Sequence, residues 1–94
     1  MAVLISKFAG TFAENKDAAR DIRLKSIMPA LEKEKEIILD FDGVTGATQS
    51  FIHALISEAL RKYGDGALNL VVFKNCVPVV REVVILVTEY MQEI

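Results

Sequence analysis

The chain has 94 residues, which is enough for one domain, since domains commonly contain about 100–150 residues. Its 52% hydrophobic and 26% charged residues can build a buried core, which excludes a disordered chain. Basic and acidic residues nearly balance, at 11 and 13, so the basic excess that nucleic-acid binding needs is missing. We expect a single domain over residues 1–94 and no nucleic-acid partner.

Cysteine and histidine usage argues against a metal site. Cys76 has no second cysteine to pair with, and the chain contains one histidine, so the common zinc ligand sets cannot form.

No glycine-rich phosphate loop is present, and no apolar stretch approaches the ~20 residues that cross a bilayer. The first residues also lack the basic flank and apolar core of a signal peptide. We expect a cytoplasmic protein with no cofactor, no metal and no membrane association.

The first half of the chain predicts two strands around a long helix. Residues 3–5 form a short apolar run that is typical of a strand near a sheet edge. Residues 13–35 have helical periodicity, with Asn15 or Glu14 near the start, and Pro29 should make this helix kink or restart close to Met28. Residues 37–41 are apolar on both faces except at Asp40, which predicts a central strand covered on both sides.

The second half predicts helix, strand and helix. Residues 51–63 carry a complete apolar stripe that ends before Gly64. Residues 68–73 predict a second buried strand, and a helix over residues 77–91 follows, with Asn75 as its N-cap and Pro78 in its first turn.

This alternation of strands and helices predicts an α/β fold: a small mixed, mostly parallel sheet of three to four strands with three helices packed on it. Loops 42–50 and 74–78 should lie side by side at the carboxyl ends of the strands, where sites gather.

Residues 38–51 read Ile-Leu-Asp-Phe-Asp-Gly-Val-Thr-Gly-Ala-Thr-Gln-Ser-Phe. This segment resembles the strand–loop–helix signature of STAS domains, the sulphate transporter and anti-sigma factor antagonist family, and more narrowly the STAS-like domains of unknown function. The positions that match are Leu39, Asp40, Phe41, Val44, Thr48, Ser50 and Phe51. The predicted element order and the Val-Phe-Lys-Asn turn before the last helix fit as well, so the resemblance covers nearly the whole chain.

The resemblance implies a non-catalytic, protein-binding regulator of bacterial signalling. In anti-sigma factor antagonists, a partner kinase of the histidine-kinase-like ATPase fold phosphorylates a serine at the start of this helix, and the complex is released. That serine falls on Ser50, and the family's Asp-Ser-Ser-Gly reads Thr48-Gln49-Ser50-Phe51 here. The alternative is that Ser50 or Thr48 serves only as the helix N-cap. The partner-binding residues that we expect are Asp42, Thr45, Thr48, Gln49, Ser50, His53, Lys74 and Asn75.

Two other interpretations compete with a regulator. Asp40, Asp42 and Lys74 could serve a small enzyme or ligand-binding domain, or Asp40 could simply accept hydrogen bonds from the loop while Asp42 begins a turn. The last helix has an apolar stripe wider than a surface helix needs, and Ile85 lies among its polar positions, which favours contact with a second copy or with a partner protein. A homodimer is therefore the other alternative.

Two single side chains also have alternative interpretations. Cys76 near a helix N-terminus is either a reactive thiol or a small hydrophobe. His53 should be a solvated surface residue on the side of Ser57, Arg61 and Lys62.

Overall fold

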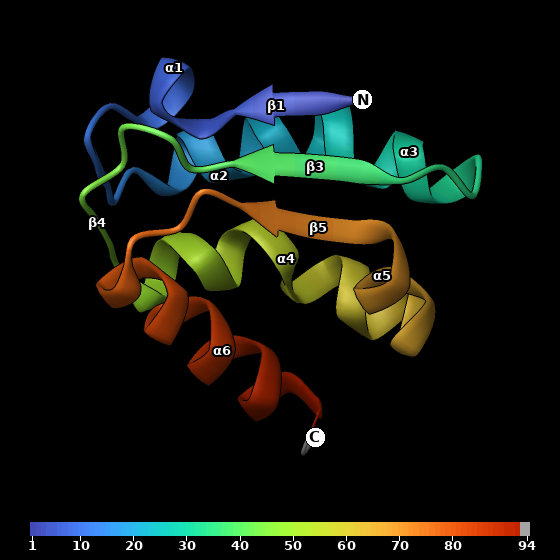
Figure 1. Cartoon of the computed structure of the whole chain (residues 1–94). Coiled ribbons are helices and arrows are strands. Elements are labelled where there is room, and N and C mark those ends of the chain that lie inside the picture. Colours follow the sequence, from blue (N-terminus) through green and yellow to red (C-terminus); the bar gives the residue numbers. More distant parts are fainter. Residues whose placement is uncertain (93–94) are drawn as a thin grey trace.

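A three-stranded parallel sheet forms one layer of the protein (Figure 1). The structure is a computed structural model and describes residues 1–92. The strands of the sheet are β1 (Ala2–Leu4), β3 (Ile37–Asp40) and β5 (Val71–Lys74), in the order β1-β3-β5. A second parallel pair joins β2 (Phe12–Ala13) to β4 (Gly46–Ala47). The helical segments are α1 (Ile5–Ala9), α2 (Lys16–Ile22), the π-helix η1 (Arg23–Ile27), α3 (Met28–Glu32), α4 (Gln49–Tyr63), α5 (Asp65–Leu70) and α6 (Pro78–Gln92).

The order of the strands in the sheet repeats their order in the chain, which decides where the helices lie. Each right-handed crossover then moves in the same direction and places its helix on the same face. Helices α2 and α4 lie in these two crossovers, and α6 follows β5. The three helices form one layer, in which α4 packs against α2 on one side and α6 on the other. The small α/β fold with a mostly parallel sheet that the sequence predicts is confirmed, with more helical segments than three.

Side-chain burial alternates along β1 and β3, as a sheet covered on one face requires. Val3, Ile37 and Leu39 are buried beneath the helices. On the opposite face, Ile38 is only partly buried and Leu4 is 42% exposed. The prediction that strand 37–41 is covered on both sides is therefore wrong, although its central position is confirmed.

The helix expected over residues 13–35 is interrupted close to where Pro29 predicts it. Asn15 caps α2, because its side-chain oxygen accepts hydrogen bonds from the backbone N–H groups of Asp17 and Ala18. The backbone of η1 follows the π-helical hydrogen-bond pattern, in which the N–H of Met28 donates to the carbonyl of Arg23, five residues earlier. A new α-helix, α3, begins at Met28, which confirms the predicted restart.

Three local predictions differ from the structure. Residues 68–70 belong to α5, and the strand begins only at Val71, because Val71 pairs with Ile37, the first residue of β3. Asn75 is not an N-cap: α6 begins at Pro78, and Asn75 has φ 58° in the left-handed region. Every strand pair within residues 1–92 is parallel, so the expected mixed sheet does not form there.

None of the helices over these same residues has the length and apolar character needed to span a bilayer.

Candidate functional site

The carboxyl ends of β3 and β5 meet at Asp40. Its Oδ1 accepts hydrogen bonds from the side-chain amide of Asn75 at 2.9 Å and from the backbone N–H of Asp42 at 3.0 Å. The N–H of Phe41 donates to the carbonyl of Lys74 at 2.8 Å, so loops 42–50 and 74–78 do meet here, as predicted. The hydrogen bond from Asn75, then that from Asp42, and the nearby charge of Lys74 lower the pKa of Asp40 below its ordinary value of 3.8.

These contacts give Asp40 a structural role. Both hydrogen bonds to its Oδ1 come from the loops that follow β3 and β5, so the carboxylate holds the two loops together. This agrees with the alternative in which Asp40 accepts hydrogen bonds from the loop. Within residues 1–92, no three Asp, Glu, His or Cys side chains are grouped so that they could hold a metal ion.

The short sheet of β2 and β4 fixes the start of α4. The N–H of Thr45 donates to the carbonyl of Thr11 at 2.7 Å, and the N–H of Thr48 donates to that of Ala13 at 3.0 Å. The Oγ1 of Thr48 in turn accepts a hydrogen bond from the N–H of Phe51 at 3.0 Å. Thr48 is therefore the N-cap of α4, as one of the two alternatives predicts.

Ser50 is the second residue of α4 and is exposed. Because Thr48 occupies the capping position, Ser50 has no part in starting the helix. Phe51 is fully buried, so its side chain packs in the core and does not cover the exposed Ser50.

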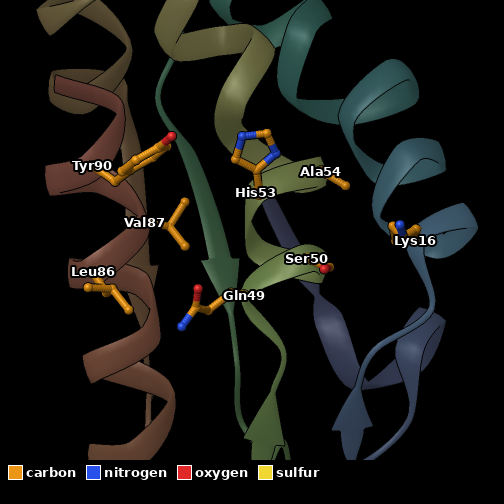
Figure 2. Close-up of a pocket in the computed structure, with 8 residues that line it drawn as sticks. All are labelled: Lys16, Gln49, Ser50, His53, Ala54, Leu86, Val87 and Tyr90. Atoms are coloured by element: carbon orange, nitrogen blue, oxygen red, sulfur yellow. The ribbon is translucent and has the colours of Figure 1, made fainter. Parts of the chain in front are cut away.

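A groove of about 440 Å³ runs over α4 between α2 and α6 (Figure 2). Its floor is the outer face of α4. Ser50 and Ala54 lie on the side of this face toward α2, and Gln49 lies toward α6. Lys16 at the start of α2 forms one wall, and Leu86, Val87 and Tyr90 of α6 form the other.

The predicted partner-binding residues fall into two neighbourhoods. Gln49, Ser50 and His53 line the groove, and Thr48 caps the helix at its end. Asp42, Lys74 and Asn75 lie at the sheet edge beside Asp40. Thr45 is exposed in the preceding loop, where its hydroxyl donates to the carbonyl of Thr11 at 3.2 Å.

Five residues that line the groove were not among the predicted site residues: Lys16, Ala54, Leu86, Val87 and Tyr90. Leu86 and Tyr90 are one turn apart and are 50% and 58% exposed, so the wide apolar stripe of the last helix was the signal for them. Ile85 is also exposed, at 43%, but it does not line the groove. Its predicted contact with a second copy stays a prediction.

Three further side chains differ from expectation or decide an alternative. His53 is partly buried in the groove floor and is not a fully solvated residue. Ser57, expected on the polar side of the helix, is buried. Burial raises the pKa of the Cys76 thiol, which disfavours the thiolate that a reactive cysteine requires.

Comparison with known proteins places the chain in a family. Residues 18–81 match the family described as "STAS-like domain of unknown function (DUF4325)", and this range includes the strand β3, the cap of α4 and Ser50. No curated protein and no solved structure matches the chain. The matched range covers more than half of the sequence, so the chain belongs to the family of STAS-like domains of unknown function.

Proposed function

We propose that this chain is a protein-binding regulatory domain that acts in the manner of an anti-sigma factor antagonist and does not catalyse a reaction itself. In this proposal the groove over α4 receives the partner, and phosphorylation of Ser50 weakens the complex. The kinase is a partner protein with the histidine-kinase-like ATPase fold, which transfers the terminal phosphoryl group of ATP to the Ser50 hydroxyl.

The position of Ser50 is the observation that carries this proposal. Its side chain is exposed in the groove floor, and the neighbouring Thr48 performs the capping that could otherwise explain a serine at this place. The surrounding surface includes the half-exposed side chains of Leu86 and Tyr90. An accessible hydroxyl in the same groove as exposed apolar side chains suits a docking surface that a modification can alter.

The fold can accept the modification. A phosphate on Ser50 adds about −1.5 to −2 charges in the first turn of α4, where the helix dipole favours negative charge. The domain should therefore remain folded while the charge of the groove changes. A switch requires this combination, because only the partner surface is then affected.

Partner capture by variants of Ser50 tests the proposal. Ser50→Ala should capture the same proteins as the wild type from the native host, whereas Ser50→Asp should capture them at least about tenfold less. Asn69→Asp is the matched control, since it adds the same charge at an exposed position of α5 outside the groove. Mass spectrometry quantifies the captured proteins and detects phosphate on Ser50.

Two results would reject the phosphorylation switch. One is equal capture by the wild type, Ser50→Ala and Ser50→Asp. The other is an equal loss of capture in Ser50→Asp and Asn69→Asp, because the loss would then follow from net charge and not from the groove.

A further inference from the structure

We propose that the segment bound in the groove is an amphipathic helix whose acidic side chains face α2 and whose apolar side chains face α6. This inference rests on the proposed protein-binding function and names the chemistry of the partner. It follows from the shape, the charge and the apolar content of the two walls.

The shape of the groove suits a helix. The floor residues Ser50 and Ala54, on the side toward α2, are one turn apart and have small side chains, so a helix can approach this side of the floor more closely than over the larger side chains of Gln49 and His53. On the α6 wall, Leu86 and Tyr90 are also one turn apart, so both rows repeat at the ~5.4 Å pitch of a bound helix. A helix that places apolar residues at i, i+4 and i+7 would meet this wall along its length.

The charged side chains of α2 indicate which charge the bound segment of the partner should carry. Lys16, Arg20 and Arg23 follow one another at i, i+4 and i+7, along one face of α2 and the start of η1. Arg23 is held by α4, through an ion pair with Glu58 at 3.1 Å and a hydrogen bond to the carbonyl of Ala54 at 3.0 Å.

The other two cations of this row are unpaired within the described part of the chain. Over residues 1–92, no carboxylate lies within 4.0 Å of the charged groups of Lys16 or Arg20. No Asp or Glu lines the groove, although Asp17 and Asp21 lie further around α2, at ~100° per residue. Lys16 lines a groove without acidic lining residues, and the exposed Arg20 lies one turn further along the same face of α2, so this side of the groove is complementary to carboxylates of a partner.

The same arrangement explains how a phosphate on Ser50 would release the partner. Ser50 and Lys16 line the same groove, and Ser50 lies on the side of α4 toward α2 (Figure 2). A phosphate there would repel acidic side chains and would compete for the Lys16 ammonium group. The apolar α6 wall would be unchanged, so release would depend on the charge of the bound helix.

A displayed library of amphipathic helices tests the inference. Each helix has about 18 residues, enough to be helical, with a constant apolar stripe and flanking positions that vary among Glu, Gln and Lys. Selection against the wild-type chain should enrich helices with Glu on one flank. The enriched peptides should bind Leu86→Glu and Lys16→Glu at least about tenfold more weakly than the wild type, by fluorescence anisotropy.

The adjacent residue Ile85 provides the matched control. Ile85→Glu introduces the same side chain on the same helix, at a similar exposure but outside the groove, and should bind as the wild type does. Exchanging Glu for Lys in an enriched peptide should abolish binding to the wild type and restore it to Lys16→Glu. Circular dichroism checks that each variant is folded.

The outcomes separate this inference from the proposed function. Enrichment of neutral or basic helices, no enrichment, or equal weakening by Leu86→Glu and Ile85→Glu overturns the acidic helix. If Ser50→Asp still reduces partner capture in that case, the regulatory function stands with a different bound segment. If Ser50→Asp leaves capture unchanged while acidic helices are enriched, the groove chemistry stands and the switch fails.

Discussion

At the scale of single residues, Gly46 shows how closely the segment before α4 is packed. A Cβ atom at this position would lie 2.7 Å from two ring carbons of Phe12, the residue that pairs with Gly46 across β2 and β4. We expect Gly46→Ala to displace the ring and to lower the free energy of unfolding by about 1 kcal/mol, the low end of the cost of overpacking, because the half-exposed ring can move. Urea denaturation measures the loss.

A second background checks the cause of that loss. Phe12 is 52% exposed, so Phe12→Ala should itself be tolerated. In the Phe12→Ala chain, Gly46→Ala should then lower the free energy of unfolding by less than about half as much as it does in the wild type. An equal cost in both backgrounds would show that the ring is not the obstacle.

At the scale of elements, the start of α4 determines whether Ser50 is available. Thr48 accepts the hydrogen bond from Phe51 that caps this helix, whereas Ser50 is exposed one position inside it. Thr48→Ala should therefore lower the free energy of unfolding by about 1 kcal/mol, and Ser50→Ala should change it by less than about 0.5 kcal/mol. Thermal or urea denaturation of the two variants decides the roles. A larger loss for Ser50→Ala would make Ser50 the cap and would remove the main argument for a regulatory serine.

Elements that depend on local signals could be predicted from the sequence. The apolar stripe and Gly64 define α4, and Pro29 explains the restart at Met28, because in both cases the cause lies within a few residues. The short strands β2 and β4 depend on pairing between distant segments, and β5 can begin only opposite the first residue of β3. These features have no local signal that the sequence could reveal.

The same distinction applies to the site. The first two turns of α4, with Gln49, Ser50 and His53, follow from the sequence because the helix start is a local feature. Lys16, Leu86 and Tyr90 come to the same groove only through the packing of α2 and α6 against α4. Asn75 was expected to cap α6. Its side chain instead contacts Asp40, which is 35 residues away in the sequence, and its backbone adopts the left-handed conformation.

At the scale of the whole molecule, placing all crossover helices on one face leaves the other face of the central sheet with little cover. Two adjacent residues of the same type test this architecture. Ile37 points toward the helices and is fully buried, whereas Ile38 points to the opposite face and is only partly buried.

Truncation of these two isoleucines should therefore have unequal effects. Ile37→Ala should lower the free energy of unfolding by about 2–5 kcal/mol, because it leaves a cavity between the sheet and the helices. Ile38→Ala should cost less than about half as much, since solvent can fill the space that it vacates. Urea denaturation at two protein concentrations measures both. Equal losses would contradict an uncovered face, and a loss for Ile38→Ala that shrinks on dilution, while that for Ile37→Ala does not, would identify a second copy of the chain as the cover.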